Sequence, residues 1–181
     1  RIRKIEIAMR DFKESTIETH YNVTIKSVPG CKILSLRKTV ADYYCEGRLW
    51  EQLYAFVREE QIKLSPGTNN LAIYHNGGTT EDGVDIEVGV MVEREGADKG
   101  GFCYRETEAV EDMACIMVYG PYENIGLSYH AFACWMEEHS QYEIAGPSRQ
   151  ICHIGSWDES DSQKFLTEVQ TPVRRILTLT P

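Results

Sequence analysis

Two glutamates lie in the middle of segments that otherwise predict β-strands, and they are the residues best placed for chemistry. In FLTEVQTPV (165–173), β-branched residues recur at every second position, so they share one face of a strand and Glu168 lies on the other. In DIEVGVMV (85–92), Glu87 is likewise opposite an aliphatic face. A carboxylate in an apolar groove has a raised pKa, and a cation restores its charge. The pair therefore indicates a site for a cationic guest; the alternative is that both carboxylates are solvated or bound to neighbouring hydroxyls.

Aromatic residues with polar tips are plentiful near these strands. Tyr and Trp combine flat contact area with one hydrogen-bonding group, which suits a planar or cationic organic molecule. Tyr74 is favoured because it alternates away from Leu71 and Ile73, and Tyr122 because it follows a Gly-Pro turn at a strand end. The alternative is that most of these rings are ordinary core or surface residues. The set comprises Tyr43, Tyr44, Trp50, Tyr54, Tyr74, Tyr104, Tyr119, Tyr122 and Trp157.

Other chemistries have little support in the sequence. The five histidines show no H-E-x-x-H or similar ligand spacing, so we expect no metal site. The six cysteines show no C-x-x-C pairing and are predicted to be reduced core residues. Neither a glycine-rich phosphate loop nor a G-x-S-x-G nucleophile motif is present. We therefore expect no cofactor and name no catalytic residue.

Length and charge set further bounds. The 181 residues, 42% of them hydrophobic, suit one sizeable domain or two small, tightly joined units. The sequence shows neither a bilayer-spanning apolar run nor a secretion leader, so we expect a cytoplasmic protein without membrane association. The net charge of −9 argues against nucleic-acid binding by this segment. It is compatible with a cationic ligand, although an acidic surface also simply keeps a protein soluble.

The first 17 residues carry an apolar stripe on an otherwise charged segment. Ile2, Ile5, Met9 and Phe12 follow a 3-4-3 spacing, which is typical of a coiled-coil seam. We interpret residues 1–17 as the end of a longer dimerising helix; the alternative is a short helix packed on its own domain. Because the sequence begins with Arg rather than Met, we expect it to be a piece of a longer protein.

From residue 21 onward the sequence repeats an element order. Residues 21–94 and 101–175 each predict strand, strand, helix, strand, strand, with a period of about 80 residues. This order predicts an α+β fold in which two pseudo-twofold related β-α-β-β repeats form an antiparallel sheet. Glu87 and Glu168 occupy corresponding positions, on the sheet face turned away from each unit's helix, and we expect these faces to surround a shared central groove. Helices are predicted at 46–61 and 124–140.

Several segments together carry a family resemblance: YNVTIKSVPGCKILSLR, EGRLWEQL, LAIYHNGG, DIEVGV, YGPYENI, GPSRQICHIG and TEVQTPV. In order and wording they resemble the effector-binding domain of the gyrase-inhibitor-like superfamily. The version they resemble most is that at the C-terminus of MerR-family transcription regulators, including the multidrug-responsive ones. The resemblance runs from 21 to 174, and its most specific parts are the Y-N-V-T-I-K opening and the T-E-V-Q-x-P-V ending.

The resemblance implies a central groove for hydrophobic or cationic small molecules. The family's groove-floor glutamate falls on Glu168, with Glu87 as its counterpart in the first repeat. At Cys152 relatives often carry an aromatic residue, which implies a wider pocket here. The family's pocket aromatics fall on Tyr43, Trp50, Tyr74 and Tyr122.

The resemblance also implies the rest of a regulator. In such proteins a DNA-binding winged helix-turn-helix and a long dimerising helix precede the effector-binding domain, here residues 21–181. This chain would then reach DNA only through a missing N-terminal domain, and the full-length protein would be a homodimer.

We therefore expect a small-molecule sensing domain of a MerR-type regulator, because the stripe in residues 1–17 favours a regulator. One alternative is a hydrolase of strained electrophilic rings, with Glu168 as general base and Tyr122 or Tyr74 as positioning donor. Another is a stand-alone sequestering or inhibitory protein.

Overall fold

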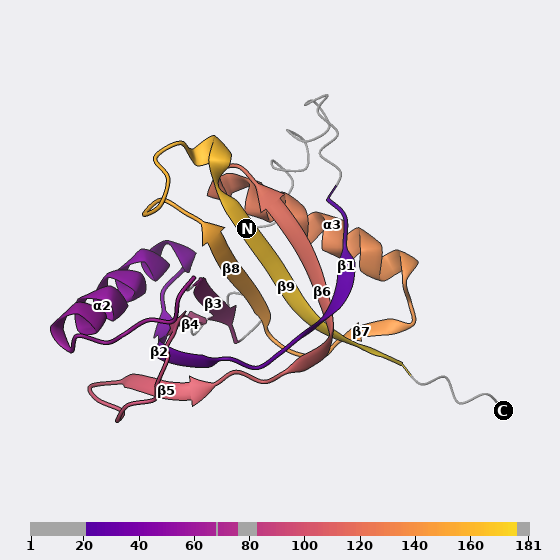
Figure 1. Cartoon of the computed structure of the whole chain (residues 1–181). Coiled ribbons are helices and arrows are strands. Elements are labelled where there is room, and N and C mark those ends of the chain that lie inside the picture. Colours follow the sequence, from indigo (N-terminus) through magenta and orange to yellow (C-terminus); the bar gives the residue numbers. More distant parts are fainter. Residues whose placement is uncertain (1–20, 68, 76–82, 177–181) are drawn as a thin grey trace.

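The computed structural model describes residues 21–67, 69–75 and 83–176, so the helix expected at residues 1–17 lies outside the described part. The described residues form one large sheet and two α-helices (Figure 1). No helix among them is long and apolar enough to cross a bilayer. The elements are β1 (Thr24–Val28), β2 (Lys32–Val40), η1 (Tyr43–Cys45), α2 (Glu46–Glu59), β3 (Asn70–Tyr74), β4 (Val84–Met91), β5 (Phe102–Glu106), β6 (Val110–Tyr119), η2 (Tyr122–Asn124), α3 (Ile125–Glu138), β7 (Tyr142–Ile144), β8 (Ser148–Ile154), η3 (Ser162–Lys164) and β9 (Leu166–Arg175).

The sheet has a pseudo-twofold order. Its strands run β1-β6-β9-β8-β3-β4-β2-β5, every recorded pairing is antiparallel, and β7 adds to β9. From one end the strands are β1, β6, β9 and β8, and from the other end they are β5, β2, β4 and β3. At each step the two strands occupy corresponding positions in the two repeats, and the two series meet at the β3–β8 pair. This arrangement confirms the predicted α+β class and the antiparallel sheet.

The first strand of each repeat is exchanged between the halves. β1 belongs to the first repeat but pairs with β6 of the second, where Lys26 is opposite Met113. β5 belongs to the second repeat but pairs with β2 of the first, where Arg105 is opposite Ile33. Each half of the sheet therefore contains a strand from the other sequence repeat, and the two halves are tied together at both edges.

Both helices cover the same face of the sheet, one over each half (Figure 1). In α2, Leu49, Leu53 and Val57 recur at helical spacing and pack on the aliphatic residues of β2 and β4. In α3, Phe132 packs with Val169 and the aliphatic residues of β6 and β9. The centre of this face, over β3 and β8, lies between the two helices.

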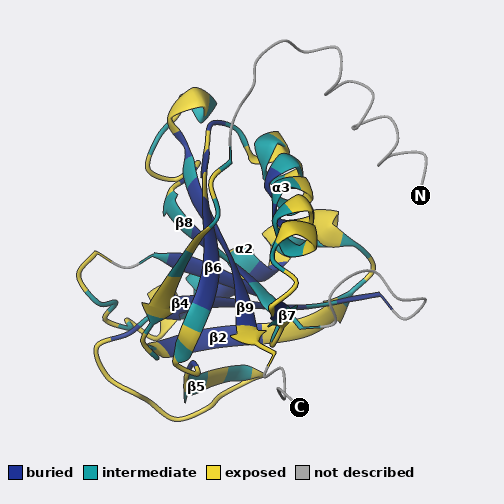
Figure 2. Cartoon of the chain, turned by 90° about the vertical axis from the view of Figure 1, so that its right-hand side faces the viewer, coloured by how far each residue is buried: buried dark blue, intermediate teal, exposed yellow. Residues whose placement is uncertain are grey.

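The opposite face of the sheet carries a smaller apolar cluster. Ile33, Leu71, Ile73 and Ile151 pack together there and are each at most 8% exposed. β3 and its neighbour β4 are consequently buried on both faces, and Figure 2 shows the buried residues concentrated in the sheet.

Candidate functional site

A groove opens between the helices on the face that they cover. It consists of two adjoining cavities of about 550 Å³ and 720 Å³, a size usual for small-molecule sites. β3 and β8 supply the floor, and the starts of α2 and α3 supply the walls. Six residues line both cavities: Tyr43, Tyr44, Glu46, Tyr122, Ile125 and Gln150.

Aromatic rings form much of the groove wall. The ring centroids of Tyr43 and Tyr74 are 5.6 Å apart, and those of Trp50 and Trp157 are 6.2 Å apart. Trp157 is 50% exposed and Tyr44 86% exposed. Large rings left this open in one place are typical of a binding surface, because a protein normally buries them.

Glu46 is the acidic residue of this groove. It is the first residue of α2, where the helix dipole favours a negative charge. Its carboxylate accepts a hydrogen bond from Trp50 Nε1 at 3.0 Å and one from the Tyr74 hydroxyl at 2.8 Å. Both donors are neutral, and within residues 21–67, 69–75 and 83–176 no cationic side chain pairs with it. The carboxylate is thus oriented but not neutralised.

The floor of the groove adds neutral hydrogen-bonding groups. Gln150 Nε2 donates to the Tyr129 hydroxyl at 3.0 Å, and Ser148 lies near the same hydroxyl at 3.5 Å. Next to them the Tyr54 hydroxyl donates to the Asn70 side-chain oxygen. These contacts fix the polar groups, so that the groove offers flat aromatic walls over a pre-positioned polar floor.

The structure brings the four predicted aromatics together. Tyr43, Trp50, Tyr74 and Tyr122 all line the groove between α2 and α3. Tyr122 also contacts Cys152, whose Sγ lies 3.9 Å from its hydroxyl oxygen. Whether these residues bind a ligand stays a prediction.

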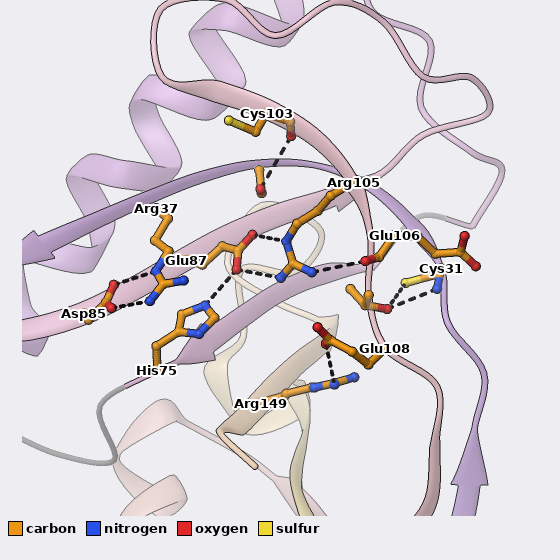
Figure 3. Close-up of polar contacts among 12 residues, drawn as sticks. Cys31, Arg37, His75, Asp85, Glu87, Cys103, Arg105, Glu106, Glu108 and Arg149 are labelled. Atoms are coloured by element: carbon orange, nitrogen blue, oxygen red, sulfur yellow. Dashed lines mark hydrogen bonds and ion pairs between the residues drawn. The ribbon is translucent and has the colours of Figure 1, made fainter.

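Glu87 occupies the other face of the sheet, where it is 3% exposed (Figure 3). Arg105 donates to both of its oxygens, at 2.7 and 2.6 Å, and His75 Nε2 lies 2.8 Å from Oε2. Burial alone would raise the pKa of Glu87, but the hydrogen bonds from His75 and Arg105 outweigh it and hold the pKa well below its usual range. Glu87 is therefore an ionised, fully partnered carboxylate.

Glu168 repeats this arrangement in the other half. It is 4% exposed, contacts Lys26 Nζ at 2.6 Å and His153 Nε2 at 2.9 Å, and accepts from Gln170 at 3.0 Å. The hydrogen bond from His153 lowers the pKa of Glu168, whereas burial raises it. With the further hydrogen bonds from Lys26 and Gln170, the pKa lies far below its usual range. Each half of the sheet thus holds one buried Glu–His–cation cluster, and in each the cation comes from the exchanged edge strand.

The expectation that the glutamates and the aromatics share one groove is wrong in this structure. Both carboxylates face away from the helices, as the alternation predicts, but the aromatic groove lies on the helix face. On β9, Thr167 lines the groove while its neighbour Glu168 points to the opposite side. For the same reason Glu168 does not lie beside Tyr122 or Tyr74, the two residues suggested as its positioning donors for a hydrolase.

Sequence reasoning missed the groove's own carboxylate. Glu46 and Trp50 are four residues apart in a predicted helix, so their side chains lie on neighbouring turns of one face. That spacing signals a carboxylate beside an indole donor, but the helix was analysed only for its apolar face. Gln150 and Tyr129 carry no comparable local signal.

Comparison with known proteins gives the family. The sequence pattern of the GyrI-like small molecule binding domain matches residues 21–174. The chain belongs to this family. No curated protein sequence matches it significantly.

Solved structures agree on the fold. The cryo-EM structure of the EcmrR-DNA complex in EcmrR-RPo contains a chain that matches with a TM-score of 0.79 and 23% identity, covering 96% of this chain. Our chain spans 64% of that EcmrR chain. The crystal structure of the EcmrR C-terminal domain matches with a TM-score of 0.73 and 23% identity, over 86% of this chain and 99% of that one. SAV2435 bound to tetraphenylphosphonium matches with a TM-score of 0.60 and 10% identity, over 84% and 94% of the two chains.

Proposed function

We propose that this GyrI-like domain is the small-molecule sensor of a MerR-type transcription regulator, and that its groove binds a lipophilic aromatic cation. One observation carries the proposal. The carboxylate of Glu46 is held between Trp50 and Tyr74 by neutral donors, inside an aromatic groove and without a cationic partner among the described residues.

Such a site favours a cation for two physical reasons. A ligand cation near Glu46 gains Coulomb energy in surroundings less polar than water. The same cation lies close to the faces of Tyr and Trp rings, whose quadrupoles attract it, by about 0.5–2 kcal/mol per contact. A neutral ligand of the same shape retains the apolar contact but loses both electrostatic terms.

The comparisons support the proposal in two ways. SAV2435, which shares the fold, was solved bound to tetraphenylphosphonium, a bulky aromatic cation. EcmrR was solved in complex with DNA, and this chain aligns with about two thirds of that protein. In the proposed regulator, DNA contact and dimerisation depend on the segment before residue 21, and the groove supplies the ligand response.

The test compares two carboxylates on opposite faces of the sheet. Tetraphenylphosphonium and neutral triphenylphosphine oxide are titrated into the chain, followed by calorimetry and by the fluorescence of Trp50 and Trp157. We expect Glu46→Gln to weaken cation binding about tenfold, equal to about 1.4 kcal/mol, and to leave the neutral compound's affinity unchanged.

Glu168→Gln is the matched control, since it makes the same chemical change outside the groove. It should leave both affinities unchanged. Loss of cation binding in Glu168→Gln but not in Glu46→Gln would transfer the site to the other face of the sheet. Equal affinity of wild type and Glu46→Gln for the cation would refute the electrostatic role of the groove.

A further inference from the structure

A second cavity lies on the face of the sheet that carries no helix. Its volume is about 900 Å³, and the sheet separates it from the aromatic groove. β3, β4, β5 and β8 form its base, and the loop between β5 and β6 forms one side. Six of its lining residues matter here: Arg37, His75, Glu87, Arg105, Glu108 and Arg149 (Figure 3).

Arg149 is the unusual residue of this cavity. It lies on β8 and its side chain is only 5% exposed, yet its Nε atom has no hydrogen-bond partner. Its recorded ion pair is with Glu108, at 3.7 Å, and the Glu108 side chain is 80% exposed. Burial lowers the pKa of the Arg149 guanidinium, but arginine stays protonated in proteins, so the charge remains and lacks a close counter-ion.

The other cations around the cavity are already occupied. Arg37 pairs with Asp85 through two hydrogen bonds, Arg105 pairs with Glu87 in the same way, and Arg174 donates to Glu143. Among the described residues that line this cavity, Arg149 is thus the buried guanidinium with unused donors. A buried charge that is poorly paired costs free energy, which an incoming anion would recover.

The pseudo-twofold symmetry shows that the fold does not need a charge at this position. Ile73 pairs with Arg149 across the β3–β8 centre, and the symmetry-related pair is Ile151 with Leu71. Leu71 therefore occupies in the first half the place of Arg149 in the second, and it is 3% exposed in an apolar cluster. A leucine satisfies the packing there, so the arginine is a departure that calls for another role.

We propose that this cavity is a second ligand site, which binds an organic carboxylate through Arg149. The planar guanidinium can donate two parallel hydrogen bonds to a carboxylate, and the weakly held Glu108 side chain is the group the ligand replaces. Other lining residues provide apolar contact, namely Ala109, Val110, Pro147 and Pro172. A carboxylate with a compact apolar body fits this combination, and its chemistry is opposite to that of the cation proposed for the groove.

Benzoate, neutral benzamide and inorganic phosphate are the probes, titrated separately into the chain by calorimetry. We expect benzoate to bind one-to-one and benzamide not to bind measurably. Arg149→Met should weaken benzoate binding at least about tenfold, because it removes charge-assisted hydrogen bonds. Glu108→Gln should tighten it several-fold, because it removes the competing carboxylate. Arg48→Met, on the exposed side of α2, makes the same charge change and should have no effect.

Arg149→Met is expected to weaken benzoate binding and Glu108→Gln to tighten it, so a loss of folding alone cannot explain both results. Arg149→Met should melt at the same temperature as wild type or higher, since an apolar side chain of similar size replaces a poorly paired buried charge. A benzoate affinity that is the same in wild type, Arg149→Met and Glu108→Gln would overturn the proposal. So would phosphate binding more tightly than benzoate, or benzoate affinity falling when tetraphenylphosphonium fills the groove.

Discussion

The substitution Arg105→Met tests how much the Arg105–Glu87 ion pair, on the sheet face that carries no helix, contributes to stability. Glu87 is 3% exposed and receives two hydrogen bonds from Arg105 and one from His75. Arg105→Met removes the paired guanidinium and leaves this carboxylate buried with its contacts to His75 and Ser35. Breaking a buried ion pair in this way costs about 3–5 kcal/mol. Because the Arg105 side chain is 29% exposed, water replaces part of the contact, and we expect the lower end, about 3 kcal/mol.

The second half of the sheet provides the matched control. Lys26 occupies the position that corresponds to Arg105, but it makes one contact with Glu168 and its side chain is 49% exposed. Glu168 retains His153 and Gln170 when Lys26 is removed. We therefore expect Lys26→Met to cost about 1 kcal/mol, the range of a solvent-screened pair.

Urea unfolding followed by circular dichroism measures both losses. For a chain of this size, about 3 kcal/mol corresponds to a fall in Tm of about 6–12 °C, and 1 kcal/mol to about 2–4 °C. The double variant Arg105→Met with Glu87→Leu should recover most of the loss, because the unpaired charge is gone. Equal losses in the two single variants, or a double variant no more stable than Arg105→Met, would refute the reasoning.

Two further predictions concern the protonation of the buried glutamates and of the cysteine thiols. The folded-state pKa values of Glu87 and Glu168 lie below the ordinary value of about 4.3. The stability that the two ionised carboxylates contribute is therefore complete above that pH and is lost as the pH falls below it. Tm measured from about pH 7 to pH 3 should fall, and it should fall less steeply in Glu168→Gln. Burial raises the pKa of the Cys115 thiol to about 12, so iodoacetamide at about pH 8 should modify exposed Cys134 and spare Cys115, as peptide mass spectrometry would show. Rapid labelling of Cys115 in the native chain, or a Tm independent of pH, would contradict them.

The spacing of apolar residues predicted the helices and strands well, because the signal for each element lies within its own segment. The apolar spacing of Leu49, Leu53 and Val57 defined a helix from 46 to 61, and α2 runs Glu46–Glu59. Residues 60 and 61 were wrongly assigned to this helix. Gln61 takes a positive φ of 52°, and the spacing of apolar residues does not reveal such a backbone conformation. The exchange of β1 and β5 between the halves is also absent from the pattern. A strand's alternation defines its two faces but not its neighbour, which depends on long-range packing.

The candidate site was predicted only in part, for a related reason. Alternation correctly set Glu168 and Glu87 opposite the helices, but the binding face was then chosen from the glutamates alone. Two helices over the outer parts of one face leave its centre open, and that gap depends on where the helices dock. Tyr122 was predicted because it follows a Gly-Pro turn at a strand end, where the chain reaches that gap, whereas Tyr43 was predicted from the family resemblance. Glu46 was missed because its helix was analysed only for the apolar face, and because its second partner, Tyr74, is 28 residues away.

The strand β9 connects the two faces of the sheet. Thr167 lines the aromatic groove, and the next residue, Glu168, reaches through the other face to Lys26 on β1. β1 begins at Thr24, close in sequence to the segment on which DNA contact depends in the proposed regulator. Because β1 pairs with β6 and β6 pairs with β9, a shift of β9 in the groove must be shared by β1 or must break the Lys26–Glu168 contact. In the proposed sensor, Glu168 thus has a structural part, although it lies outside the proposed ligand groove.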